Sequence, residues 1–328
     1  MTNAMIYAMR IHQHGGPEVM QWEQVEVGAP AAGEVRLKAT AIGLNFIDTY
    51  HRNGTYKLPL PSVIGREGAG IVEAIGGGVT EVSVGDRVAY ASNPVGSYAQ
   101  ARVLPVGRLV KIPNGVTDNQ AASMMLKGMT AQYLLRRTYK VMPGDIILNH
   151  AAAGGVGQIL GQWAKHLGAT VIGTVGSAAK AEIAKANGCE YVINYAEEDF
   201  AARVLEITNG KKCAVVYDGV GKDTFQKSLD CLAPRGLLAI YGAASGPVPP
   251  FNLGELAAKG SLFITRPTLD TYTSTREELL ETANELFDVV ARGIVKITVA
   301  QTYALQDAVQ AHIDLEARKT TGSTVLIP

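Results

Sequence analysis

Hydrophobic positions are spaced in two different ways along this chain, and the change falls near Asn119. Before that point, short apolar runs are broken by turns such as Gly15-Gly16-Pro17 and Gly76-Gly77-Gly78. Runs of this kind predict strands joined by tight turns. The predicted strands are Met5–Ile11, Trp22–Val27, Glu34–Ile42, Gly70–Ile75 and Arg87–Tyr90. The first part of the chain is therefore expected to form a small β-rich domain.

Strands and helices alternate after Asn119, where the pattern first predicts helices over Ala121–Leu126 and Thr130–Arg137. The strands that follow are expected at Ile146–Leu148, Thr170–Val175, Tyr191–Asn194, Ala214–Tyr217, Leu237–Ile240 and Leu262–Thr265. The helices between them are expected at Gln158–Leu167, Ala178–Ala186, Asp199–Thr208, Thr224–Cys231 and Leu253–Lys259. Strands that alternate with helices in this way predict an α/β fold with a doubly wound parallel sheet.

The pattern changes again after Arg266-Pro267. An amphipathic helix is predicted over Thr275–Ala291, a second helix over Gln306–Ala317 and a last strand over Thr324–Ile327. This tail is too short to form a domain alone. We therefore expect residues 1–127, completed by residues 268–328, to form one domain and residues 128–267 to form the other.

Composition narrows the classes of function. Lysine plus arginine and aspartate plus glutamate number 30 each, which argues against nucleic acid or a membrane surface as the main partner. No apolar run is long enough to cross a bilayer, and the N-terminus lacks the apolar core of a signal peptide. The three cysteines have no paired spacing, which fits a reducing compartment. A cytoplasmic protein is the expectation.

A small-residue turn carries the clearest chemical signal. Ala151, Gly154 and Gly157 form an A-x-x-G-x-x-G pattern between the predicted strand Ile146–Leu148 and the predicted helix Gln158–Leu167. A dinucleotide pyrophosphate approaches the backbone closely at such a turn and binds at the helix N-terminus. The turn predicts a Rossmann-type dinucleotide site.

The end of the next strand indicates which dinucleotide binds. NAD-specific sites place an acidic residue there to bind the ribose 2′-hydroxyl. Here the strand Thr170–Val175 is followed by Gly-Ser-Ala-Ala-Lys, and no acidic residue occurs before Glu182. Ser177 and Lys180 suit a 2′-phosphate, so NADPH is the expected cofactor. The alternative is that Lys180 is simply a solvated helix residue.

Several motifs, in order, resemble those of one family. They are His14-Gly-Gly-Pro-Glu18, Ala41-Ile-Gly-Leu-Asn-Phe-Ile-Asp-Thr-Tyr50, Gly65-Arg-Glu-Gly-Ala-Gly70, Val84-Gly-Asp-Arg-Val88, Ala151-Ala-Ala-Gly-Gly-Val-Gly157, Val192-Ile-Asn-Tyr195, Val216-Tyr-Asp-Gly-Val220, Leu262-Phe-Ile-Thr-Arg-Pro267 and Thr321-Gly-Ser-Thr-Val-Leu-Ile327. Over essentially its whole length the chain resembles the zeta-crystallin-like NADPH:quinone oxidoreductases of the medium-chain dehydrogenase/reductase superfamily. The resemblance implies a GroES-like catalytic domain, a Rossmann domain, and a cleft between them for cofactor and substrate.

The resemblance also implies roles for individual residues. The expected cofactor-binding residues are Asn45, Thr130, Gly154, Gly155, Val156, Thr174, Ser177, Lys180, Tyr195, Tyr241, Gly242, Ala243, Ile264, Thr265 and Arg318. The expected lining of the catalytic site is Asn45, Asp48, Tyr50, Tyr56, Arg66 and Lys127. Arg318 has a simpler alternative as a solvated cation at a helix end, and each tyrosine has one as ordinary half-buried packing.

Zinc alcohol dehydrogenases belong to the same superfamily, so a metal must be considered. Catalytic zinc in that group is held by cysteine, histidine and a further cysteine or aspartate. Asn45 stands at the position of the first cysteine and Arg66 at that of the histidine, and no cysteine precedes Cys189. None of the six histidines forms a ligand pair, and His150 beside the small-residue turn is expected to be packed or solvent-linked. No metal is expected.

Without a Lewis acid, an electron-poor acceptor is the natural substrate because it takes up the hydride charge itself. We expect hydride or electron transfer from NADPH to a quinone. Tyr50 and Tyr56 would stack on a flat ring or hydrogen-bond a developing oxyanion, and Asp48 would orient Asn45 or a water. The alternatives are an NADPH-dependent enone (alkene) reductase and, in a different class, an NADPH-sensing RNA-binding protein. The strand Leu262–Thr265 is expected at a sheet edge, where a homodimer would form.

Overall fold

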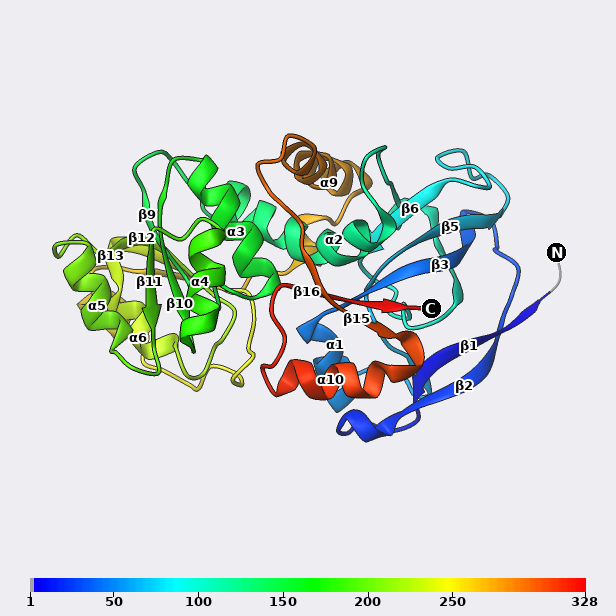
Figure 1. The fold of residues 1–328 in the computed structure, drawn as a ribbon, viewed down its shortest axis with the longest axis horizontal. Helices are drawn as coiled ribbons and strands as arrows, with labels where there is room; N and C mark the ends of the chain where they lie inside the picture. The colour runs from blue at the N-terminus through cyan, green and yellow to red at the C-terminus, as the bar shows by residue number, and fades with distance from the viewer. Residues whose placement is uncertain (1–2) are drawn as a thin grey trace. The chain divides into compact units, whose positions relative to one another are not determined.

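The computed structural model describes residues 3–328, which divide into two compact units. Of the described residues, the first unit comprises 3–127, 273–287 and 297–328, and the second comprises 128–272 and 288–296. Figure 1 labels the elements of both units. None of the described helices is both long enough and apolar enough to cross a membrane.

The first unit is built on two sheets. Its strands are β1 (Ala4–Ile11), β2 (Met20–Val27), β3 (Glu34–Leu44), β4 (Ser62–Val63), β5 (Glu67–Ile75), β6 (Arg87–Ala91), β7 (Ala101–Pro105), β8 (Val110–Lys111), β15 (Val299–Ala304) and β16 (Ser323–Ile327). The larger sheet has the order β15-β16-β3-β5-β6-β8, with β7 also paired to β3. The smaller sheet has the order β2-β1-β4. Apolar side chains of β1, β3, β16 and α10 share one core that includes Ile11, Ile42 and Leu326.

The tail of the chain supplies one side of the larger sheet. β16 runs antiparallel to β3, with Val325 opposite Gly43, and β15 runs parallel to β16. Sequence analysis predicted β16 but missed β15. The side chains of β15 alternate between partly buried and exposed, and its residues are mostly small or polar, so it lacks the apolar run that indicates a strand.

The second unit contains a six-stranded parallel sheet. Its strands are β9 (Ile146–Asn149), β10 (Thr170–Val175), β11 (Tyr191–Asn194), β12 (Cys213–Asp218), β13 (Leu232–Ile240) and β14 (Phe263–Thr265). The order is β11-β10-β9-β12-β13-β14, and every neighbouring pair is parallel. This is the order of a doubly wound nucleotide-binding sheet, in which the direction of the strand order reverses beside β9. The predicted fold class is confirmed.

The helices of this unit connect successive parallel strands, except for α8, which follows the last strand. They are α3 (Gly155–His166), α4 (Ala178–Ala186), α5 (Phe200–Ile207), α6 (Phe225–Asp230), α7 (Gly254–Ala258) and α8 (Leu269–Tyr272). In Figure 1, α3 and α4 lie together beside one face of the sheet, and α5 and α6 lie together beside the other. Apolar side chains such as Leu148, Val216 and Leu238 are fully buried between these layers.

The remaining helices are α1 (Phe46–Asn53), α2 (Asp118–Tyr133), α9 (Arg276–Ala291) and α10 (Ala308–Glu316). Two predictions need correction. The helices expected over Ala121–Leu126 and Thr130–Arg137 are one continuous helix, α2, which ends in a π-helical turn over Leu134–Thr138. Helix α1 was not predicted, because its buried residues are polar or charged and break the apolar period that indicates a helix.

Candidate active site

The small-residue turn lies between the end of β9 and the start of α3. Gly154 precedes the helix in an extended conformation and has no side chain that caps the first turn. A Cβ atom on Gly157 would lie 2.4 Å from the carbonyl oxygen of Ala151, so only glycine fits there. The Asn149 side chain donates to the Gly157 carbonyl over 2.9 Å and fixes the turn to β9. The first-turn N–H groups are therefore available to an anion, as in dinucleotide sites.

The end of β10 brings together the residues expected at a 2′-phosphate. Ser177 is the N-cap of α4, and its hydroxyl accepts from the backbone N–H of Lys180 over 3.4 Å. A Cβ atom on Gly176 would lie 2.6 Å from the Tyr195 hydroxyl, so the Tyr195 ring packs directly over this glycine. Ser177, Lys180 and Tyr195 thus gather where β10 ends. No carboxylate lies between Val175 and Lys180 in the sequence to repel a phosphate there.

Thr174, also expected to bind cofactor, is placed differently. It is buried in β10, and its hydroxyl lies 2.8 Å from Nδ1 of His150. Nε2 of His150 lies 2.9 Å from the Ser228 hydroxyl, and burial lowers the pKa of His150. His150 is therefore a packed, neutral histidine, and the Thr174 hydroxyl already has a partner inside the unit.

Five of the remaining cofactor candidates lie in or after the later strands, and three lie in helices. Tyr241, Gly242 and Ala243 follow β13, and Ile264 and Thr265 are paired with β13 in β14. A Cβ atom on Gly242 would lie 2.5 Å from the Gly219 carbonyl oxygen, which brings the segment after β13 against the segment after β12. Thr130 lies buried in α2. Gly155 and Val156 form the first turn of α3. Ligands of doubly wound sheets bind at the carboxyl ends of the strands.

The first unit holds a buried polar cluster around Asn45 and Glu67. Asn45 is the N-cap of α1, directly after β3, and its Nδ2 donates to Glu67 Oε2 over 2.7 Å. Lys127 Nζ lies 3.3 Å from the same oxygen and donates to the Leu44 carbonyl over 3.1 Å. The backbone N–H of Leu126 donates to Glu67 Oε1 over 2.8 Å. Both carboxylate oxygens of Glu67 are therefore held by protein donors, one of them a cation.

Asp48 joins the same cluster from α1. Its Oδ2 accepts from the backbone N–H of Asn45 over 2.9 Å and from the Tyr98 hydroxyl over 3.1 Å. Its Oδ1 has no hydrogen-bond partner among the described residues, although the side chain is fully buried. Burial raises the pKa of Asp48 to about 7, against the lowering effects of its hydrogen bonds and of Lys127. Asp48 is thus a carboxyl group that changes charge near neutral pH.

The other predicted lining residues have varied surroundings. Tyr50 packs edge-on against Tyr56, with ring centroids 5.4 Å apart, and Tyr56 is 40 % exposed. Arg66 is buried directly before β5. Arg318 is exposed at the end of α10 with a φ of 59°, in the left-handed region. Asn45, Asp48 and Lys127 lie in one hydrogen-bonded cluster, and the two tyrosines form a separate aromatic pair.

Sequence reasoning missed three members of the buried cluster. Tyr98 Oη lies 3.0 Å from Nε2 of His312, and Nδ1 of His312 lies 2.8 Å from a terminal nitrogen of Arg52. These residues come from three separate parts of the chain, with Tyr98 and His312 214 positions apart. No local pattern marks any of them, so no sequence signal for the cluster was available.

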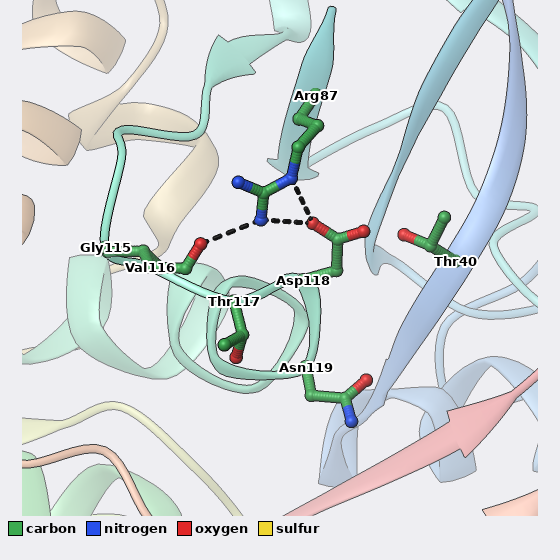
Figure 2. Close-up of a pocket in the computed structure, with 7 residues that line it drawn as sticks. All are labelled: Thr40, Arg87, Gly115, Val116, Thr117, Asp118 and Asn119. Carbon is green, nitrogen blue, oxygen red and sulfur yellow. Dashed lines mark hydrogen bonds and ion pairs between the residues drawn. The ribbon is translucent and has the colours of Figure 1, made fainter.

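A surface pocket elsewhere in the first unit contains none of the predicted site residues (Figure 2). It is lined by Thr40, Arg87, Gly115, Val116, Thr117, Asp118 and Asn119. Arg87 donates to Asp118 Oδ1 over 2.8 Å and to the Val116 carbonyl over 2.7 Å. These bonds fasten the start of α2 to β6, which gives the polar groups a structural role.

A dinucleotide-type parallel sheet combined with a β-rich unit defines a class, the medium-chain dehydrogenases and reductases. Residues 31–114 match the alcohol dehydrogenase GroES-like domain family, and residues 155–287 match the zinc-binding dehydrogenase family. Among residues 3–328, no group of three or more His, Cys, Asp or Glu side chains is arranged to hold a metal ion.

Individual relatives narrow the class. The chain is 55 % identical to a quinone oxidoreductase of Pseudomonas aeruginosa, over 96 % of this chain and 97 % of the relative. It is 52 % identical to a 2-haloacrylate reductase of a Burkholderia species, over 99 % of both. The crystal structure of an Escherichia coli quinone oxidoreductase complexed with NADPH is 50 % identical, with a TM-score of 0.96 over 98 % of this chain and all of that one. The chain belongs to the quinone oxidoreductase family of the medium-chain dehydrogenase/reductase superfamily.

Proposed function

We propose that this protein catalyses the NADPH-dependent reduction of quinones without a metal. The observation that carries the proposal is the environment of Glu67, whose oxygens are held by Lys127, Asn45 and the Leu126 N–H. A carboxylate already neutralised by a buried lysine is a poor metal ligand, and Arg66 beside it in the chain adds a second cation. A site without a Lewis acid suits an acceptor that stabilises the incoming charge itself.

The second unit fits NADPH by its own geometry. The turn after β9 offers backbone N–H groups close to where Gly157 excludes any side chain, which suits a pyrophosphate. Ser177 and Lys180 at the end of β10 would bind the 2′-phosphate, with Tyr195 beside them. The segments after β13, together with Ile264 and Thr265, would flank the nicotinamide end. NADPH, when bound, supplies the hydride.

The residues of the first unit would orient the reactants. Asn45 is held from two sides: Glu67 fixes its side chain and Asp48 fixes its backbone N–H. A group held this rigidly can position a cofactor or acceptor without losing rotational freedom on binding. Tyr50 and Tyr56 present aromatic surface suited to a flat ring. Arg318, exposed at the end of α10, is assigned to the cofactor by family resemblance.

The test is NADPH oxidation followed at 340 nm with a panel of quinones. The match to a 2-haloacrylate reductase favours one second candidate, reduction of an electron-poor alkene. The same assay therefore includes enones and halogenated acrylates. Quinones should give the highest kcat/KM. A higher kcat/KM for the alkenes would replace the proposed acceptor, and no oxidation by any acceptor would refute both candidates.

The edge strand β14 supports a proposal of a homodimer. β14 pairs with β13 on one side and ends the sheet on the other, and its Phe263 is 60 % exposed. An exposed apolar edge strand is a template for pairing with a second copy.

The three cysteines are buried and free, and burial raises their pKa values. Unpaired cysteines of this kind suit a reducing cytoplasm.

A further inference from the structure

The buried residues beside Asp48 form a series of hydrogen bonds in which every donor points toward Asp48. Arg52 is 2 % exposed, and its guanidinium makes two bonds to Glu316, of 2.8 and 2.9 Å, and one to the Gly15 carbonyl. From this anchor, a terminal nitrogen of Arg52 contacts His312, His312 contacts Tyr98, and Tyr98 contacts Asp48. All of these residues lie in the first unit.

The direction of each bond follows from the chemistry of Arg52. A guanidinium has only donors, so Nδ1 of His312 must accept from it. Burial and the nearby Arg52 lower the pKa of His312 to about 3, so the ring is neutral and its one proton lies on Nε2. Nε2 therefore donates to the Tyr98 oxygen. The Tyr98 hydroxyl proton is then directed to Oδ2 of Asp48.

This direction determines where Asp48 can carry a proton. Oδ2 already receives two donors, the Tyr98 hydroxyl and the Asn45 N–H. A proton on Oδ2 would require Tyr98 to turn and donate to Nε2, which already carries hydrogen. The proton of a neutral Asp48 must therefore lie on Oδ1, the oxygen that has no partner among the described residues. A buried polar atom without a partner calls for an explanation, and a proton given to a bound molecule supplies one.

We propose that Asp48 donates a proton from Oδ1 to the reduced acceptor, and that Tyr98, His312 and Arg52 are positioning residues that keep the proton on that oxygen. The proposal rests on the proposed quinone reduction. Addition of hydride to a quinone gives the hydroquinone monoanion, which needs one more proton. The O–H bond of Asp48 breaks, an O–H bond of the hydroquinone forms, and the electron pair stays on the Asp48 carboxylate. Asp48 remains as the carboxylate, and the proton that renews it must enter at Oδ1, because the Arg52 guanidinium closes the other end of the series of hydrogen bonds.

Several charged groups influence this carboxyl. Lys127 of α2 lowers the pKa of Asp48, and Glu67 of β5 raises it slightly, while the Tyr98 hydroxyl stabilises the charged form. His312 stays neutral, and Arg52 acts through it. With a pKa near 7, Asp48 is protonated in a useful fraction of molecules at neutral pH, as a general acid requires.

Tyr98→Phe tests the positioning role because it removes one donor to Oδ2. The carboxylate loses stabilisation, so the pKa of Asp48 should rise and quinone reduction should persist to higher pH than in the wild type. A merely damaged site would lose activity at every pH. His312→Gln retains a donor and an acceptor and should keep the wild-type profile. His312→Leu leaves the Tyr98 hydroxyl able to donate to Asp48, so it should shift the profile in the same direction as Tyr98→Phe but by less. Tyr90→Phe, at a buried tyrosine outside the chain, is the control and should change nothing.

Two measurements separate this proposal from the proposed function. The first is the pH dependence of quinone-coupled NADPH oxidation, in which Asp48→Asn should lower kcat by about 10²-fold, as for a lost general acid, and flatten the limb above pH 7. The second is the carboxyl ¹³C shift of Asp48 in protein without cofactor, assigned by its absence in Asp48→Asn. An unchanged titration midpoint in Tyr98→Phe overturns the positioning role, and an unchanged pH profile in Asp48→Asn overturns proton donation. If no quinone oxidises NADPH, the proposed function is refuted. The ¹³C titration would still show whether Tyr98 influences the pKa of Asp48.

Discussion

Asp48→Asn should change how the stability of the first unit depends on pH. Asp48 is fully buried, and its pKa rises from an ordinary 3.8 to about 7 in the folded protein. The folded state therefore holds a proton that the unfolded chain has released between these values, so stability falls as pH rises through this window and is level above it. At about 1.4 kcal/mol per pKa unit, ionising Asp48 inside the fold costs about 4 kcal/mol. The part of that cost incurred between pH 5 and pH 8 is about 2.5 kcal/mol.

The assay is urea unfolding at pH 5, 6, 7 and 8, followed by fluorescence. The two tryptophans lie in different units, Trp22 in β2 and Trp163 in α3, so Trp163→Phe leaves a single reporter in the unit that contains Asp48. In that background, the free energy of unfolding of Asp48→Asn relative to that of the parent should rise by about 2.5 kcal/mol between pH 5 and pH 8. Asp86→Asn is the control, because Lys111 lowers the pKa of Asp86 and the difference should stay flat. A constant difference for Asp48→Asn would refute the buried titration.

Three further substitutions test other parts of the structure. Lys127→Met leaves the buried Glu67 carboxylate without its cation and should lower the free energy of unfolding by about 3–5 kcal/mol in urea titrations, whereas Lys227→Met, at an exposed pair, should change it by less than about 1 kcal/mol. Lys180→Ala should raise KM for NADPH about tenfold or more in steady-state assays and leave KM for NADH unchanged; Lys185→Ala on the same helix is the control, and equal effects on both cofactors would contradict the assignment. If β14 forms the proposed homodimer, Phe263→Asp should give a monomer in light scattering, whereas Leu253→Asp, at an exposed position outside the strands, should leave the oligomeric state unchanged.

The sequence predicted the elements in which local pattern and burial agree. Most strands of the parallel sheet are short apolar runs between turn residues, and Gly157 marks a turn where no larger side chain fits. These features follow from neighbouring residues, so a single sequence reveals them. Family resemblance then placed Asn45, Asp48 and Lys127, which the structure brings into one cluster.

What the sequence did not reveal depends on contacts between distant residues. Helix α1 buries Asp48 and Arg52 instead of an apolar stripe, because partners from other segments satisfy their charges. His312 acquires its role only when α10 lies against α1, 260 positions from Arg52 in the sequence. The merging of two predicted helices into α2 has a similar cause, since Lys127, the polar residue between them, is buried by bonds to β3 and β5.

The most direct test of the account is the rate of quinone-dependent NADPH oxidation by protein exhaustively treated with a chelator and checked for metal by mass spectrometry. The account predicts full activity in the metal-free protein, because Lys127 and Asn45 occupy the carboxylate that a metal would need. It also predicts a strong preference for NADPH over NADH through Ser177 and Lys180. Loss of activity on chelation with recovery on added zinc, or equal use of the two cofactors, would contradict it.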